Sequence, residues 1–95
     1  MASSMKFDQD KPRWDLVPLI TIEQIAKVLT YGAQKYKPNS WQNLSDARNR
    51  YHAALLRHLT LWQSGESIDP ESKLPHIAHV ACNAMFLVYL EIARK

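Results

Sequence analysis

The sequence predicts an all-α protein, and three observations point to this class. Apolar residues recur at three- and four-residue spacing in three stretches that glycine or proline separates, as in amphipathic helices. Alternation of apolar and polar residues, which a strand requires, never persists beyond a few positions. The chain has 95 residues, enough for one small core. We therefore expect a bundle of three to four helices.

The composition predicts one globular domain with more apolar surface than its own core can bury. Hydrophobic residues make up 46% and charged residues 22% of the chain, both ordinary values. We expect a mobile segment at residues 1–12 and a single domain at residues 13–95, with Trp14 or Leu16 docking on the core. Three tryptophans, four tyrosines and two phenylalanines exceed what so small a core needs, which favours a homo-oligomer.

The length of the apolar runs, the single cysteine and the distribution of charge argue against several classes of protein. No apolar run approaches the roughly 20 residues of a membrane helix, and the first ten residues lack the apolar core of a secretory signal. With the single cysteine, Cys82, these features predict a cytoplasmic protein without an internal disulfide. The net charge of +3 is scattered, so nucleic acid is not an expected partner. The basic residues form either a solvated surface or one that attracts phosphorylated small molecules.

The first helix is expected at Thr21–Tyr31. Thr21 and Gln24 fit a capping box, and Gly32 suits a C-terminal cap. The segment Ala33–Leu44 then reads as a loop. The apolar stripe of this helix consists of Ile22, Ile25, Ala26, Val28 and Leu29.

The second helix is expected from Ser45 or Asp46 to Gln63. Ser45 is a good N-cap, Asp46 is favourable beside the positive end of the helix dipole, and Gly65 ends the helix. Its buried face is predicted to hold Tyr51, Leu55, Leu59 and Trp62.

The third helix is expected from Pro75 or His76 to the C-terminus, because proline is tolerated in the first turn. A short acidic loop, Ser64–Leu74, precedes it. The apolar residues of this helix are Ile77, Val80, Ala81, Ala84, Leu87, Val88 and Ile92.

The histidines suggest a polar pocket between the second and third helices. His58 lies in the apolar arc of its helix, where a buried imidazole needs partners for both nitrogens. His76, His79 and Asn83 share one stripe at three- and four-residue spacing. Taken singly, such a residue is more often a structural polar residue with its own partner, and it is the set with an inward His58 that suggests the pocket. His52 lies away from His58 on the helical wheel and is predicted at the surface.

The acidic loop holds a candidate metal site. Glu66 and Asp69 form an E-x-x-D pair, with Glu71 two residues later. Clustered carboxylates repel one another, and either a divalent cation or raised pKa values of the acids relieve this repulsion. Oxygen ligands favour Mg²⁺ or Mn²⁺ over zinc. The alternative is an exposed acidic loop in which Asp69 caps a turn before Pro70.

The loop after the first helix combines basic and aromatic residues. Lys35 offers a positive charge to phosphate, and Tyr36 and Trp41 offer stacking faces to a base. The alternative is that the aromatic rings plug the edge of the core. Arg57 on the second helix adds a further cation, and Cys82, in an apolar helix, reads as an inert thiol.

Five motifs in one order resemble a known family. They are K-P-R-W-D-L-x-P at 11–18, Y-G-A-x-K-Y at 31–36 followed by S-W at 40–41, R-H-L at 57–59, G-E-x-x-D-x-E at 65–71 and L-x-H-x-x-H-x-x-x-N at 74–83. Over about residues 6–90 the chain resembles the phage-encoded dATP/dGTP diphosphohydrolases, which are related to the MazG-like all-α nucleotide pyrophosphatases.

The resemblance implies a dimeric or tetrameric hydrolase of acid anhydrides. Such an enzyme cuts a nucleoside triphosphate between its α- and β-phosphates in the host cytoplasm, using Mg²⁺ or Mn²⁺ held by carboxylates. On this reading the catalytic residues are His58, Glu66, Asp69 and His79, of which Glu66, Asp69 and His79 bind the metal. The substrate-binding residues are Lys35, Tyr36, Trp41, Arg57 and Asn83.

One departure keeps other functions open. The MazG-like pattern has an E-x-x-E pair on one helix and an E-x-x-D pair on a later one. Here the second helix has no acid after Asp46, and the third has none until Glu91. The alternative is a non-catalytic nucleotide-binding or phage–host interaction protein on the same fold. A small basic nucleic-acid-binding domain is a third reading, against which the scattered charge counts.

Overall fold

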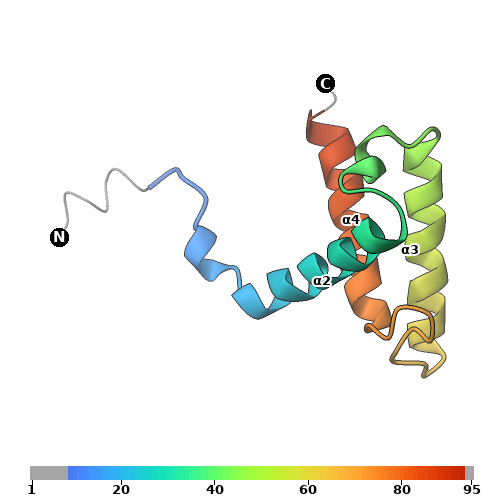
Figure 1. The fold of residues 1–95 in the computed structure, drawn as a ribbon. Coiled ribbons are helices and arrows are strands. Elements are labelled where there is room, and N and C mark those ends of the chain that lie inside the picture. The colour runs from blue at the N-terminus through green and yellow to red at the C-terminus, as the bar shows by residue number, and fades with distance from the viewer. Residues whose placement is uncertain (1–8, 94–95) are drawn as a thin grey trace.

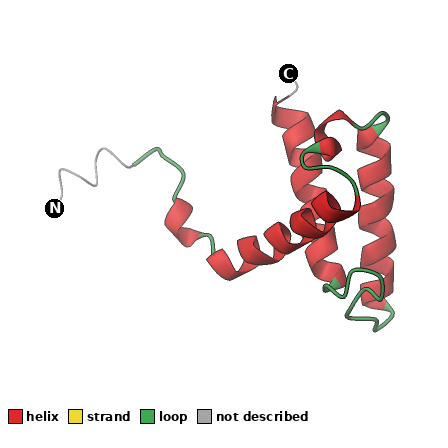
Figure 2. Cartoon of the chain, viewed as in Figure 1, coloured by secondary structure: helices red, strands yellow, loops and turns green. Residues whose placement is uncertain are grey.

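The computed structural model describes residues 9–93 and confirms the all-α class. Three α-helices account for most of this part of the chain: α2 (Leu19–Lys35), α3 (Ala47–Gln63) and α4 (His76–Ala93). Two short 3₁₀ helices lie before and after α2, at η1 (Trp14–Leu16) and η2 (Ser40–Asn43). Residues 9–93 form no strand, only one isolated bridge between Ile68 and Pro75 (Figure 2).

Helices α3 and α4 run side by side in opposite directions, and α2 crosses α4 (Figure 1). The C-terminal half of α2 lies against α4, whereas its N-terminal half projects away from the α3–α4 pair. The buried core is small and lies between α3 and α4, where it includes Ala47, Tyr51, Cys82 and Phe86. Apolar side chains of α2, such as Val28 and Leu29, pack against this cluster and close one side of it.

An aromatic cluster fixes the segment between α2 and α3. The ring of Phe86 stacks on Trp41 at 4.5 Å and touches Tyr51 at 4.6 Å between ring centroids. The Tyr51 hydroxyl donates a hydrogen bond of 2.6 Å to the Trp41 carbonyl oxygen. Because Trp41 belongs to η2, these contacts attach η2 to α3 through Tyr51 and to α4 through Phe86.

The predicted first helix was too short at both ends. It begins at Leu19 after Pro18, and the Thr21 hydroxyl donates to the Pro18 carbonyl at 2.7 Å, so Thr21 lies inside the helix and is not its cap. Gly32 also lies inside the helix. The residues that follow it, alanine, glutamine and Lys35, are good helix formers and carry the helix to Lys35.

The predicted start and inner face of the second helix also need correction. The N-cap is Asp46, in the left-handed region at φ 55°, rather than Ser45. The carboxylate of Asp46 makes no capping hydrogen bond to the backbone of the helix. It accepts a hydrogen bond of 2.9 Å from the side-chain amide of Asn49 instead. Trp62, predicted to be buried, is 46% exposed. It lies on the last turn of α3, one turn beyond His58, which already contacts the first residue of α4, His76. The end at Gln63 is confirmed, as is the start of the last helix at His76.

The N-terminal arm, residues 9–18, was predicted to dock on the core through Trp14 or Leu16, and this prediction is wrong. Trp14 is 82% and Leu16 is 69% exposed, and the arm extends from the projecting end of α2 (Figure 1). The radius of gyration is 16.3 Å, whereas a compact domain of this length has about 12 Å. Residues 1–8 of the predicted mobile segment lie outside the described residues.

Helix α4 is long and apolar enough to cross a membrane by length and composition alone, a test that the core helix of a globular protein also passes. It packs against both α2 and α3, and it buries the polar side chains of His76, His79 and Asn83. We therefore describe α4 as the central helix of the bundle.

Candidate functional site

An open groove of about 1090 Å³ lies between α2, the η2 segment and the α3–α4 pair. It receives side chains from all three α-helices and from the acidic loop before α4. Of the nine site residues expected from the sequence, eight line this groove, and Glu66 is the exception. The eight are Lys35, Tyr36, Trp41, Arg57, His58, Asp69, His79 and Asn83.

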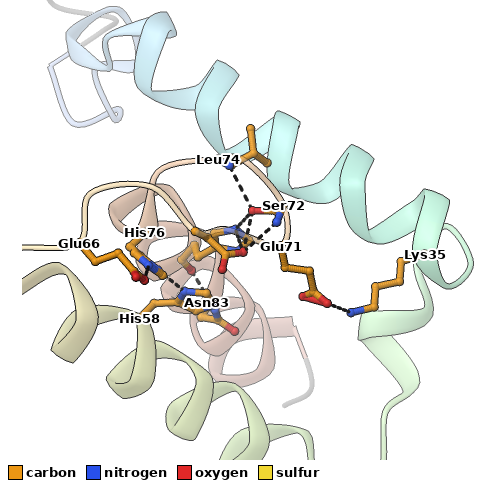
Figure 3. Close-up of polar contacts among 10 residues, drawn as sticks. Lys35, His58, Glu66, Glu71, Ser72, Leu74, His76 and Asn83 are labelled. Carbon is orange, nitrogen blue, oxygen red and sulfur yellow. Dashed lines mark hydrogen bonds and ion pairs between the residues drawn. The ribbon is translucent and has the colours of Figure 1, made fainter.

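At one side of the groove an ion pair joins α2 to the acidic loop. The Lys35 ammonium lies 2.9 Å from a Glu71 carboxylate oxygen (Figure 3). This hydrogen bond raises the pKa of Lys35 and lowers that of Glu71. The ammonium also lies over the ring of Tyr36, 5.4 Å from its centroid. Charge and aromatic surface therefore meet at the mouth of the groove.

A hydrogen-bonded trio lies deeper in the groove. The Ser72 hydroxyl donates to Asp69 Oδ2 at 2.8 Å, and His79 Nε2 lies 2.7 Å from the same hydroxyl. Burial alone would raise the pKa of Asp69, but hydrogen bonds from the Ser72 side chain and backbone outweigh it and lower that pKa. Burial lowers the pKa of His79. An ionised carboxylate and a neutral imidazole therefore coexist here at neutral pH.

A second polar chain crosses from the acidic loop to α3. His76, fully buried at the start of α4, has its Nε2 2.6 Å from a Glu66 oxygen and its Nδ1 2.8 Å from His58 Nδ1 (Figure 3). The rings of His58 and His79 stack at 4.3 Å with 7° between their planes. Burial, reinforced by the neighbouring imidazoles, lowers the pKa of His58 to about 4, so His58 is neutral at pH 7.

The predicted polar pocket between the second and third helices exists, but its acids are divided. Glu66 contacts His76, whereas Asp69 contacts Ser72 and His79, so the E-x-x-D pair is not brought together. Among residues 9–93, no group of three or more histidine, cysteine or acidic side chains is placed to hold a metal ion.

The other predicted residues differ in how far their side chains are free to meet a ligand. Trp41 lines the groove, yet Phe86 covers one of its faces, so Trp41 also plugs the core edge as the alternative reading expected. Tyr36 is 68% exposed and leaves its ring available. The buried Asn83 amide donates to the His79 carbonyl at 2.8 Å and so ties one turn of α4. His52 is exposed, as predicted.

Three residues of the site were missed by sequence reasoning. Arg50 lines the groove with Arg57, and their seven-residue separation on one helix was the available signal. Ser72 lies three residues after Asp69, a spacing typical of local turns in which an acid accepts backbone hydrogen bonds. His76 had been placed on the stripe with His79 but was given no role, because spacing alone does not reveal its partner.

Cys82 agrees with its predicted inertness. It is fully buried, and burial raises the pKa of its thiol to about 12. The reactive thiolate form is therefore suppressed at neutral pH.

These features define a class: a small all-α protein whose helices enclose an open groove with cations and aromatic rings at its mouth and acidic and imidazole groups within. Comparison of the sequence with known families gives the assignment. All 95 residues match the family described as dATP/dGTP diphosphohydrolase, N-terminal, and the chain belongs to this family.

One curated relative is similar over most of the chain. It is a dATP/dGTP diphosphohydrolase of Salmonella phage PMBT28, 35% identical over 88 residues, which are 93% of this chain. The matched region spans 30% of the relative's length. No solved structure matches the chain.

Proposed function

We propose that this chain carries the nucleotide site of an enzyme that hydrolyses dATP or dGTP to the monophosphate and pyrophosphate. Membership of the dATP/dGTP diphosphohydrolase family and the name of the phage relative support this reaction. A protein of this function encoded by a phage would act in the host cytoplasm, where deoxynucleoside triphosphates occur.

The observation that carries the proposal is the composition of the groove. Lys35, Arg50 and Arg57 line it and supply positive charge for a triphosphate. The exposed ring of Tyr36 offers a stacking face to a base, and Trp41 adds apolar surface beside it. A volume of about 1090 Å³ is ample for a nucleotide, since typical small-molecule sites have about 300–1,000 Å³.

His58 is the proposed general base. It is neutral at pH 7, lines the groove and is close to the carboxylate-bearing loop. In the reaction a water O–H bond breaks and its proton passes to the imidazole, while the oxygen bonds to the α-phosphorus. The bond from that phosphorus to the bridging oxygen breaks, and pyrophosphate leaves with the electron pair. The proton then returns to solvent.

We propose Mg²⁺, or Mn²⁺, as the cofactor, arriving with the triphosphate. Mg²⁺ is usually held by one or two carboxylates together with substrate phosphates rather than by an all-protein cage. The absence of a three-ligand group within residues 9–93 fits this mode. Asp69, kept ionised by Ser72, and Glu71 are the groove carboxylates that would meet the ion. The ion supplies neutralisation of phosphate charge.

Product analysis tests the proposal directly. The purified chain is incubated with a panel of ribo- and deoxynucleoside triphosphates, with Mg²⁺, with Mn²⁺ or with chelator, and products are separated by chromatography. We expect monophosphate and pyrophosphate from dATP or dGTP, and only when metal is present. A His58→Gln preparation purified in parallel excludes a contaminating hydrolase.

The opposite result would favour the second candidate. The division of the acids between two hydrogen-bonded chains supports a protein that binds nucleotides without cutting them. In that case dATP or dGTP raises the melting temperature, since a ligand of the native state stabilises it, yet remains intact. If the chain shows no turnover and the nucleotide does not shift its melting temperature, the nucleotide site itself is contradicted.

We also propose that two or more copies associate through the N-terminal arm. Trp14 in η1 and Leu19 and Ile20 at the projecting end of α2 are each at least 69% exposed. Sedimentation velocity should give a mass of at least twice the 11.0 kDa of one chain. Leu19→Asp should shift the species to 11.0 kDa, whereas Lys27→Asp, exposed on the same helix, should not. A monomer for the unmodified chain would contradict the proposal.

A further inference from the structure

Three side chains form a continuous polar chain that starts at the protein surface and ends at the groove. Glu66 lies in the loop after α3, and its carboxylate accepts a hydrogen bond from His76 Nε2 at 2.6 Å. The other nitrogen of His76, Nδ1, lies 2.8 Å from His58 Nδ1 (Figure 3). His76 is fully buried, so these two residues are the partners available to its ring nitrogens.

The direction of each hydrogen bond follows from the chemistry of its partners. An ionised carboxylate only accepts, so the hydrogen between Glu66 and His76 belongs to His76 Nε2. When His76 is a neutral imidazole it carries one N–H, and with that hydrogen on Nε2 its Nδ1 is an acceptor. In this form His58 Nδ1 is the donor of the second bond, and the lone pair of His58 is on its Nε2.

The free nitrogen of His58 opens to the groove. No buried side-chain nitrogen or oxygen in the described part of the chain lacks a hydrogen-bond partner, and the hydrogen bond of the His58 ring within this part is made by Nδ1, not by Nε2. This nitrogen is therefore accessible, and His58 lines the groove. The parallel ring of His79, 4.3 Å away, holds the plane of the His58 ring.

We propose that Glu66 and His76 are positioning residues that hold His58 in the tautomer with hydrogen on Nδ1 and its Nε2 lone pair toward the groove. This inference rests on the proposed function for its consequence, since the lone pair is what accepts the proton of the attacking water. It gives Glu66 a role different from the metal ligand expected from the sequence. A carboxylate that orders a histidine pair need not contact the substrate.

The tautomer can be measured without any assay of activity. The chain has four histidines, so a two-bond ¹H–¹⁵N correlation spectrum of ¹⁵N-labelled protein at pH 8 contains four ring systems, assigned with single His→Gln variants. For the unmodified protein we expect His58 to be protonated at Nδ1 and His76 at Nε2. Protonation of His58 at Nε2 would overturn the proposal, whatever the enzyme's activity.

Removal of the carboxylate tests the role of Glu66. In Glu66→Ala, we expect the His58 signals to move toward a mixture of the two tautomers, because His76 loses the acceptor that fixes its own N–H. Glu71→Ala is the matched control: this acid lies in the same loop but pairs with Lys35, so the His58 tautomer should not change. An unchanged His58 tautomer in Glu66→Ala would show that Glu66 does not position it.

Kinetics separate this inference from the proposed function. Glu66→Gln should lower kcat by about 10- to 100-fold, the range found for groups that orient the histidine ligands of metal sites, with KM unchanged. A rise in KM without loss of kcat would instead make Glu66 a substrate-binding residue. If the unmodified chain hydrolyses no nucleotide, the proposed function fails, but the tautomer measurement still decides the positioning role.

Discussion

His58→Gln is expected to lower kcat for dATP or dGTP hydrolysis by about 10²- to 10⁴-fold, the usual contribution of a general base. His58 is neutral at pH 7 because burial lowers its pKa to about 4. Its Nδ1 is engaged with His76, so one nitrogen remains to accept a proton in the groove. Glutamine keeps a hydrogen-bonding side chain of similar length but is not a base. Initial rates of pyrophosphate release at saturating substrate measure the change.

His52→Gln provides the matched control for this prediction. His52 lies on the same helix, is exposed and does not line the groove, so kcat should stay within about twofold of the unmodified value. Melting curves of both variants separate loss of chemistry from loss of fold. If His58→Gln retains full kcat, His58 is not the base, and the base has to be sought among the other groove residues.

Phe86→Ala is expected to destabilise the fold by about 3–5 kcal/mol, the usual cost of removing a buried aromatic ring. The ring is 9% exposed and contacts both Trp41 and Tyr51, so its loss leaves a cavity where η2, α3 and α4 meet. Small domains have total stabilities of about 5–15 kcal/mol, so this change removes a large share. Urea unfolding followed by circular dichroism measures the difference in the free energy of unfolding.

Val88→Ala is the control for the core prediction. Val88 lies on the same helix but is 60% exposed, so its truncation should change the free energy of unfolding by no more than about 0.5 kcal/mol. The Trp41 emission should also change in Phe86→Ala and not in Val88→Ala, because Phe86 stacks on Trp41. Equal effects of the two substitutions would show that the aromatic cluster is not the centre of packing.

The helices themselves were predictable because their signals are local. The start of α4 at His76 and the end of α3 at Gln63 were read from a neighbouring proline and glycine. The errors lie at helix ends and on one uncovered face. Helix α2 continues past Gly32 because the alanine, glutamine and Lys35 that follow are good helix formers. Trp62, on the last turn of α3, is 46% exposed.

The candidate site was predictable in its membership more than in its contacts. Eight of the nine expected residues line one groove. Helix spacing explains why His79 and Asn83 share a face of α4, but not why Tyr36, Trp41 and Asp69, which lie outside the α-helices, join them. Spacing did not reveal the partner of each side chain. Glu66 and Asp69, three residues apart, join different histidines because the loop between α3 and α4 directs them to separate places.

The sequence by itself determined the all-α class, the approximate helices and the choice of polar residues, since periodicity and capping depend on neighbours along the chain. Only the tertiary structure decided that His76 connects Glu66 to His58, and that Arg50 joins Arg57 in the groove. It also left the N-terminal arm exposed, where the sequence predicted docking. The physical reason is that hydrogen bonds and burial between distant segments depend on how the helices pack, which no local pattern specifies.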